Sequence, residues 1–455
     1  MSHPVTRRSF LKAVAAAGAA VTILPEGLAR TYAANEKINI AFVGSGGMGG
    51  GNLRHISALK TGTGTPLVNV VGLCDVDRNR LKAAQKGHAQ AKTFVDFRKM
   101  LTDMSKEIDA VMVSTPDHTH YPASAMAIKL GLAVSTEKPL THSIWEARQL
   151  GLLAKKHNVV TQHDHEGHAG GGLRMGVEWI KSGVIGTVRE VHIFTDRPTG
   201  WWPQGLAKRP PTQPVPKNLE WDLWIGAAPY RDYHKHLHAF AWRGWWDFGT
   251  GALGDMGCHF FDLAFWALDL GEGLKVSDKD PIVISAEHEG NSKETYPKWS
   301  IVTLKFPARG KLPPVTVKWY DGGKLPTPPP EFGTKRKFPR NGSMFIGEKG
   351  PMLVYDTGGV RLLPESKMKG FKGPKPFLPR PGDHKREWLL AVKGEGKASS
   401  NFTDYGGPLA EVVLLGNLAI AAGKTVEWDA VNLKAKNAPE VSNIIRREYR
   451  KGWDL

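Results

Sequence analysis

Residues 38–49 read Ile-Asn-Ile-Ala-Phe-Val-Gly-Ser-Gly-Gly-Met-Gly, and this stretch decides the fold. The apolar run 38–43 is typical of a buried parallel strand, and a helical pattern follows from about Met48 to Leu59. Glycines between a strand and a helix allow a tight turn and let the backbone approach a pyrophosphate at the helix N-terminus. We therefore predict a dinucleotide-binding turn whose cofactor contacts are Gly44, Gly46, Met48 and Gly49.

Strand and helix patterns alternate through the next hundred residues. Further buried strands are expected at 67–73, 110–113 and 133–135. Helices are expected between and after them, at 78–90, 121–130 and 144–157. Short connections in such an alternation favour a doubly wound parallel sheet, which is a Rossmann domain.

The pattern changes after about residue 185. Period-two alternation at 188–195, 282–287, 300–306 and 315–319 predicts an open, mostly antiparallel sheet with one covered face. The predicted fold class is therefore α/β, with a Rossmann domain at 35–162. A second α/β domain, for catalysis, substrate binding and oligomerisation, is expected at 163–455.

The second predicted strand leads to Asp75, which bears on the choice of cofactor. A carboxylate at this position can accept hydrogen bonds from the adenosine ribose hydroxyls, and its charge disfavours a 2′-phosphate. We therefore expect NAD as the cofactor. Arg78 and Arg80 lie nearby in the sequence and leave NADP possible.

The first 34 residues have the composition of a targeting segment. Residues 6–12 read Thr-Arg-Arg-Ser-Phe-Leu-Lys, an apolar stretch follows to Leu24, and small residues come next. This order is typical of a signal peptide, and the paired arginines resemble the twin-arginine export signal. We expect a periplasmic or otherwise exported protein that has the twin-arginine machinery as a partner. Since no dissolved dinucleotide pool exists outside the cytoplasm, the cofactor would have to be loaded before export and held tightly.

The composition excludes several other classes of protein. The 455 residues are 41% hydrophobic and 23% charged, as in a folded globular chain, and no later apolar run suggests a stable membrane span. The net charge of +17 comes without any nucleic-acid-binding motif, so we expect a dispersed basic surface. Cys74 and Cys258 are expected to be buried and unpaired.

Three further motifs make a resemblance specific: Thr115-Pro-Asp-His-Thr-His120, Glu137-Lys138-Pro139 and Gly251-Ala-Leu-Gly-Asp255-Met-Gly-Cys-His259. With the glycine turn, they resemble the glucose–fructose oxidoreductase, inositol dehydrogenase and MocA family over about residues 38–450. The resemblance implies a nicotinamide site lined by Pro116, His120 and Glu137, and Thr115 is a further predicted cofactor contact. Pro139 is expected to fix a turn, for which a cis bond is one option. The resemblance also implies a homo-oligomer, either a dimer or a tetramer.

The predicted catalytic residues are Lys138, Asp255 and His259, which the resemblance places at the substrate. Oxidation of a secondary alcohol needs a base for the hydroxyl proton, and a histidine with a near-neutral pKa suits a proton that moves both ways. Asp255 would share a helix face with His259 and orient it or the substrate. The charge of Lys138 would favour the developing alkoxide.

An aromatic-rich insertion at 197–250 suggests a carbohydrate pocket, because aromatic faces pack well against the C–H faces of sugars. The predicted substrate contacts in it are Arg197, Trp202, Trp242 and Arg243. Residues 163–168 read His-Asp-His-Glu-Gly-His, and such side chains can bind zinc. We favour substrate hydrogen bonding by His165 or His168 and expect no metal.

These residues predict an exported oxidoreductase that transfers a hydride between a carbohydrate hydroxyl and bound NAD. One alternative is a redox-neutral glycosidase or epimerase, in which bound NAD oxidises a sugar and later returns the hydride. The other alternative is a catalytically idle sugar-binding protein on the same scaffold, against which the intact Lys138, Asp255 and His259 argue.

Overall fold

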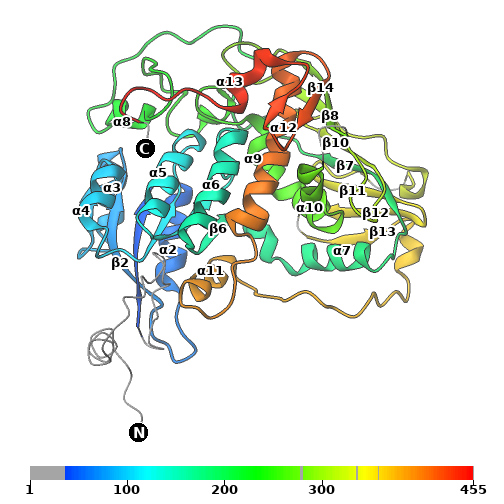
Figure 1. Ribbon diagram of the computed structural model, residues 1–455, viewed down its shortest axis with the longest axis horizontal. Helices are drawn as coiled ribbons and strands as arrows, with labels where there is room; N and C mark the ends of the chain where they lie inside the picture. The colour runs from blue at the N-terminus through cyan, green and yellow to red at the C-terminus, as the bar shows by residue number, and fades with distance from the viewer. Residues whose placement is uncertain (1–35, 277–279, 335–336, 357, 454–455) are drawn as a thin grey trace, which may run out of the picture.

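The computed structural model describes residues 36–453 except 277–279, 335–336 and 357. The predicted signal segment, residues 1–34, therefore lies outside the described residues. Two sheets stand side by side, with helices α9 (Gly251–Phe260) and α12 (Gly407–Ala422) between them (Figure 1). The predicted α/β class is confirmed, since one sheet is parallel and the other is mostly antiparallel.

The first sheet has six parallel strands in the order β3-β2-β1-β4-β5-β6. Their bounds are β1 (Ile38–Val43), β2 (Val68–Cys74), β3 (Lys92–Phe94), β4 (Ala110–Val113), β5 (Ala133–Glu137) and β6 (Thr161–Asp164). The strand order reverses between β1 and β4, where ligands bind in open α/β sheets at the carboxyl ends of the strands.

The helices of this domain are α2 (Met48–Ala58), α3 (Arg78–Gln85), α4 (Phe97–Met104), α5 (Asp117–Lys129) and α6 (Ile144–His157). Helix α6 has the predicted bounds, because a Ser143–Glu146 capping box starts it and left-handed Asn158 ends it. Helix α3 is shorter than predicted and ends at Gln85, while α4 was not predicted.

The second sheet has nine strands in the order β13-β12-β11-β7-β10-β9-β8-β14-β15. Only the β7–β10 pair is parallel among the described pairs. The bounds are β7 (Val188–Phe194), β8 (Ile282–Glu289), β9 (Trp299–Phe306), β10 (Val315–Tyr320), β11 (Gly342–Gly347), β12 (Gly350–Tyr355), β13 (Val360–Leu362), β14 (Val426–Asp429) and β15 (Lys434–Ala435). Helices α7 (Gly171–Lys181), α10 (Asp262–Ala267) and α12 pack into the same hydrophobic core as these strands.

Helix α12 is apolar on most of its surface, and its polar side chains are Glu411 and Asn417. With the preceding turn it forms a 21-residue segment, Phe402–Ala422, that is long and apolar enough to cross a membrane by length and composition. However, 78% of its most apolar window is buried inside the protein, against α6, α9 and β8. An apolar helix enclosed in this way is typical of a domain core.

The two domains are not separated at one point of the chain. Strand β6 spans the predicted boundary at residue 162, so the change of sheet comes after Asp164. Helix α11 (His384–Val392) then returns to the first domain, where buried Trp388 joins the core formed around β1. Near the end of the chain, Trp453 packs on Phe97 of α4.

Candidate active site

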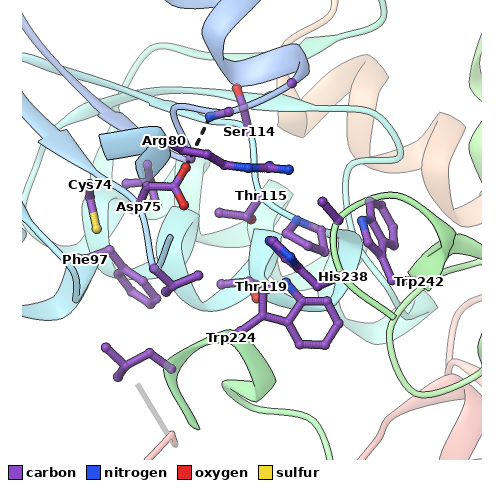
Figure 2. A pocket seen from close by; sticks show the side chains of 18 of the residues that line it. Cys74, Asp75, Arg80, Phe97, Ser114, Thr115, Thr119, Trp224, His238 and Trp242 are labelled. Carbon is purple, nitrogen blue, oxygen red and sulfur yellow. Dashed lines mark hydrogen bonds between the residues drawn. The ribbon is translucent and has the colours of Figure 1, made fainter. Parts of the chain in front are cut away.

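A cavity opens at the carboxyl ends of β1, β2, β4 and β5, beside the start of α2. Its walls include ten residues predicted for the cofactor, the chemistry or the substrate: Gly44, Gly46, Met48, Asp75, Thr115, Pro116, Glu137, Lys138, Trp242 and Arg243. Figure 2 shows Asp75 and Arg80 on one side, with Trp224, His238 and Trp242 of the insertion on another.

The glycine turn is built for close backbone approach. Gly44 has a φ of 89°, and a Cβ there would lie 2.4 Å from the carbonyl oxygen of Ser114. Gly49 does not line the cavity; a Cβ at this position would lie 2.1 Å from the carbonyl oxygen of Gly44. Gly47 faces open space, at the start of α2. This turn leaves room for a pyrophosphate at the positive end of the helix.

Asp75 ties the glycine turn to the end of β2. Its Oδ2 accepts hydrogen bonds from the backbone N–H groups of Ser45 (2.9 Å) and Gly46 (3.1 Å). Its Oδ1 accepts one bond, from the N–H of Asp77 at 2.9 Å, which leaves acceptor capacity for a ribose hydroxyl. Arg80 borders the same cavity, as Figure 2 shows.

His120 does not line the cavity. Its ring is 1% exposed and lies between two carbonyl oxygens, with Nδ1 2.7 Å from Pro139 O and Nε2 2.7 Å from Thr115 O. The structure therefore corrects the prediction of a direct cofactor contact, because His120 instead fixes the two loops that carry such contacts. The Lys138–Pro139 bond is cis, which was one option for this turn.

Glu137 lines the cavity and accepts a hydrogen bond from the side-chain amide of Asn52, a residue of α2. Asn52 Nδ2 donates to Glu137 Oε1 at 2.9 Å and to Ser114 Oγ at 3.1 Å. Burial raises the pKa of Glu137 to about 7, and nearby Asp164 adds to the shift. This carboxyl group therefore titrates near neutrality at the edge of the cavity.

Lys138, Asp255 and Arg243 form one charged group. Lys138 Nζ lies 3.0 Å from Asp255 Oδ1, and Arg243 Nε lies 3.0 Å from the same oxygen. Although burial favours the neutral acid, the two cations hold the pKa of Asp255 below its usual range. The structure thus brings the predicted Lys138 and Asp255 together, and it adds Arg243 to them.

His259 lies one helical turn after Asp255 on α9. Burial and the charge of Lys138 lower the pKa of His259 to about 3. The expectation of a near-neutral pKa was therefore wrong, because a half-buried imidazole that is largely desolvated and lies beside a cation resists a second proton. The ring is neutral throughout the physiological pH range.

Asp117 was not predicted, although it belongs to the Thr115–His120 motif. It is 2% exposed and accepts a hydrogen bond from Thr250 Oγ1 at 2.7 Å. Burial raises its pKa to about 7. The signal was available, since Asp117 opens α5 directly after a parallel strand.

The aromatic insertion is mainly a hydrophobic core of its own, formed by Trp221, Trp224, Tyr233, Trp242, Trp245 and Phe248 with their neighbours. Trp224 and Trp242 also face the cavity, and Trp224 was not predicted there. Arg197 and Trp202 are outside the cavity wall. Arg197 pairs with Asp196, and the Nε1 of Trp202 donates to Gln204 at 2.8 Å, so both have local partners.

The His163–His168 segment does not border this cavity either. His165 is 1% exposed, and His168 is fully buried. Both rings face the carboxylate of Asp262 at the start of α10. The structure therefore does not support the predicted substrate contact by His165 or His168.

The parallel sheet with its glycine turn is a dinucleotide-binding Rossmann domain. With the second sheet, it defines a two-domain protein. A model described as an oxidoreductase family with an NAD-binding Rossmann fold matches residues 38–165. A second model of the same family, for its C-terminal α/β domain, matches residues 177–312. The chain belongs to the glucose–fructose oxidoreductase, inositol dehydrogenase and MocA family of oxidoreductases, and it carries an NAD-binding domain.

Similar curated proteins include sugar and polyol dehydrogenases. An inositol 2-dehydrogenase of Saccharopolyspora erythraea is 31% identical over 24% of this chain and 30% of its own length. The D-glucoside 3-dehydrogenase of Escherichia coli is 26% identical over 29% of this chain and 36% of its own length. The chain spans about half or less of the curated relatives that it matches.

Solved structures match over most of the chain. The WlbA dehydrogenase of Bordetella pertussis, in complex with NADH and UDP-GlcNAcA, has a TM-score of 0.57 at 16% identity, covering 86% of this chain and 99% of that one. The aldose–aldose oxidoreductase of Caulobacter crescentus, complexed with glycerol, has a TM-score of 0.56 at 15% identity, covering 86% of this chain and all of that one. At these identities the likeness shows the shared fold.

Proposed function

We propose that the protein is an exported dehydrogenase that transfers a hydride between a secondary hydroxyl of a carbohydrate and tightly bound NAD. One observation carries the proposal: Lys138, held 3.0 Å from Asp255 beside Arg243, faces the same cavity as the glycine turn. The relatives named inositol 2-dehydrogenase and D-glucoside 3-dehydrogenase support a sugar, polyol or glycoside as the substrate.

Each charged residue has a role in this proposal. When bound, NAD accepts the hydride from the substrate carbon. Lys138 and Arg243 provide positive charge where the hydroxyl becomes an alkoxide, and Asp255 holds both cations in place. His259 is the proposed proton acceptor, because it follows Asp255 by one turn of α9 and its neutral ring has one nitrogen with a lone pair.

The insertion supplies a wall suited to a sugar. Trp224 and Trp242 border the cavity, and aromatic rings pack against the C–H faces of pyranosides. The guanidinium of Arg243 lies 4.3 Å from the ring centre of Trp242, so a hydrogen-bond donor sits beside an apolar face. This combination supports a ligand that has both hydroxyls and apolar C–H surfaces.

The first prediction tests the chemistry by following reduction of the bound cofactor at about 340 nm while sugars, polyols and glycosides are added. Lys138→Ala and His259→Ala should each lower turnover by about 10²–10⁴-fold, as loss of an acid–base or electrostatic group does. Bound dinucleotide should remain, because both groups serve the substrate side. Lys99→Ala, which removes an exposed lysine of α4 paired with Asp103, is the matched control.

The time course separates the open alternatives. A lasting absorbance rise identifies a dehydrogenase, whereas a rise and decay with a cleaved or epimerised product identifies redox-neutral turnover. Full activity in both variants would contradict the proposed chemistry. If none of these compounds reduces the NAD bound to the wild-type protein, the protein is an idle binding protein. The pH profile is a second readout: a proton acceptor with a pKa of about 3 predicts no acidic loss of kcat/KM above about pH 5.

The second prediction concerns export, for which residues 6–34 provide the argument. Replacing Arg7 and Arg8 together by lysine should hold the precursor in the cytoplasm, folded and with its dinucleotide, because the paired arginines are the export signal. Fractionation and mass spectrometry of the denatured protein check both points. Normal appearance of this variant outside the cytoplasm would rule out the twin-arginine route, and exported protein without dinucleotide would rule out loading before export.

The proposal also includes self-association as a dimer or tetramer through the open nine-stranded sheet. The second apolar cluster of this sheet, built from Phe194, Tyr320, Phe332, Met344, Leu353 and Leu363, is already buried within one chain, so this part of the proposal rests on the family resemblance. Light scattering on the purified protein should give a mass of two or four chains. A monomer at micromolar concentration would contradict this part of the proposal.

A further inference from the structure

Four histidine rings gather behind the charged group of the cavity, where β6 meets α10 and α11. Their ring centres are separated by 4.5 Å (His163–His165), 5.1 Å (His165–His168) and 5.8 Å (His165–His384). All four rings are at least nine-tenths buried, as is the Asp262 carboxylate they surround. A buried group of imidazoles around a carboxylate is costly unless its polar atoms have partners.

The side chains of His165, His168 and Asp262 place possible metal-ligand atoms close together. Asp262 Oδ2 lies 3.4 Å from His165 Nε2, and His168 Nδ1 lies 3.1 Å from both Asp262 oxygens, to which it is hydrogen-bonded in the metal-free protein. The three ligand atoms are all within 4.8 Å of one another. Two ligands that bind one zinc ion tetrahedrally at about 2.0–2.1 Å are separated by about 3.4 Å, so modest side-chain movement would close this set on an ion.

The hydrogen bond of His165 shows which of its two ring nitrogens carries the hydrogen and which carries the lone pair. His165 Nδ1 lies 3.1 Å from the backbone carbonyl oxygen of His163, and a carbonyl can only accept. Nδ1 must therefore carry the hydrogen, which leaves a lone pair on Nε2 of the neutral ring. That lone pair faces an Asp262 oxygen, which also has only lone pairs, so either a second proton on His165 or a metal cation lies between them.

Unpartnered nitrogens in the same group point to the same conclusion. Among the described residues, His165 Nε2, His168 Nε2, His384 Nδ1 and both ring nitrogens of His163 are buried without a hydrogen bond. His384 Nε2 lies 3.0 Å from the carbonyl oxygen of His163 and donates to it, so the nitrogen of His384 that carries the lone pair is Nδ1. Buried polar atoms in such number are rare unless they serve a ligand or an ion.

We propose that His165, His168 and Asp262 bind a divalent transition-metal ion of the zinc class. The two histidines are three residues apart around a short 3-10 turn (Glu166–Ala169), in which such positions lie one above the other. Imidazole and carboxylate are ligands that zinc accepts, and the Tyr405 hydroxyl donates a hydrogen bond to Asp262 that would orient the carboxylate. The ion would join the edge of the Rossmann sheet to α10 of the second domain.

This inference is independent of the proposed dehydrogenase activity, and so is its test. Tag-free mature protein, stripped with a chelator and dialysed, is titrated with Co²⁺ while its visible d–d absorption is recorded, and Zn²⁺ is then added as a competitor. Wild-type protein should take up one Co²⁺ per chain, lose the band to Zn²⁺, and melt at a higher temperature with Zn²⁺ than without.

Single variants locate the ion. His165→Gln and Asp262→Asn should weaken Co²⁺ binding by about 100-fold or more, since even outer partners of metal ligands are worth about 10–100-fold. His288→Gln removes a half-buried imidazole of β8 and should bind as the wild type does. If Asp262→Asn does not fold, His165→Gln and the wild-type titration still decide. A wild type without saturable uptake, or a His165→Gln variant with unchanged affinity, would overturn the site and leave a proton as the cation.

Discussion

Asp255 and Asp117 are buried carboxyl groups with opposite electrostatic surroundings. Asp255 has two cations within 3.0 Å and is ionised. Asp117 accepts a hydrogen bond from the Thr250 hydroxyl and has no cation in direct contact among the described residues, so burial dominates and raises its pKa to about 7. The Asp255 carboxylate therefore holds Lys138 and Arg243, which line the cavity, while Asp117 is a neutral acid below pH 7.

The third prediction is that Asp117→Asn changes how stability depends on pH. The raised pKa means that wild-type stability is greatest when Asp117 is protonated and falls as the pH rises from its unfolded value of about 4 to about 7. Asparagine keeps an oxygen that can accept from Thr250 and carries no charge. Relative to wild type, the variant should gain roughly 2–3 kcal/mol of unfolding free energy between pH 5 and pH 8.

Urea unfolding at both pH values measures this difference. Asp103→Asn, at an exposed residue that pairs with Lys99, is the control and should show no comparable pH effect. Equal stability of Asp117→Asn and wild type at both pH values would mean that Asp117 is ionised in the folded protein.

The sequence motifs predicted the position of the charged group of Lys138, Asp255 and Arg243 better than they predicted the contacts of single residues. The Glu137–Lys138–Pro139 and Asp255–His259 motifs pointed to residues that the structure brings together, because each follows a strand or helix with a fixed direction. The predicted contacts of His120, Arg197 and Trp202 failed for a different reason. These side chains bind neighbouring groups instead of the ligand cavity. Those contacts depend on loop conformations, which the spacing of apolar residues in the sequence does not predict.

Elements with strong local signals were predicted nearly to the residue. Strands β1 and β4 and helix α6 have their expected bounds, since each is an unbroken apolar run or a capped helix. Strands β11 to β15 were missed. They are two to six residues long and acquire their pairing from β7 and β8, which lie far away in the sequence.

The fourth prediction concerns the contact between α2 and the glycine turn. In Gly49→Ala the new Cβ would lie 2.1 Å from the carbonyl oxygen of Gly44, so the helix must move away from β1. NAD affinity should fall by at least about tenfold, because the N–H groups at the helix start leave the pyrophosphate position. Retention of dinucleotide during purification and isothermal titration measure the loss.

Gly51→Ala on the same helix is the matched control. Its Cβ would approach nothing closer than the Met48 sulfur at 4.0 Å. It should bind NAD normally and gain up to about 1 kcal/mol from better helix propensity. Equal NAD affinity in Gly49→Ala and Gly51→Ala would show that the close approach of Gly49 has no role in binding.

The molecule as a whole is joined by segments that leave the first domain and return to it. Trp388 of α11 is fully buried in the core around β1, more than 300 residues after that strand. Figure 1 shows α11 beneath the Rossmann helices, at the end of a long connection from the second sheet. The core of the first domain is therefore completed by residues that the sequence pattern assigned to the second.

The fifth prediction follows from this arrangement. Trp388→Ala should cost about 3–5 kcal/mol, as removal of a large buried aromatic side chain does, and the loss should appear in the domain that binds NAD. Thermal unfolding with and without NAD checks it. Phe377→Ala, in the connection before α11, removes a side chain that is 55% exposed and should change the melting temperature little. A normal melting temperature for Trp388→Ala would mean that α11 is not part of the first domain's core.

The last turn of the chain has a consequence for synthesis. Trp453 borders the cofactor cavity and packs under Arg98, whose guanidinium lies 4.0 Å from the ring centre. On the ribosome, the glycine turn emerges hundreds of residues before this wall exists. The nascent chain can therefore form the strands of its nucleotide site early, yet the part of the cavity wall that Trp453 supplies is added only once that residue has been synthesised. Stable enclosure of the dinucleotide would then follow synthesis of the segment that contains Trp453.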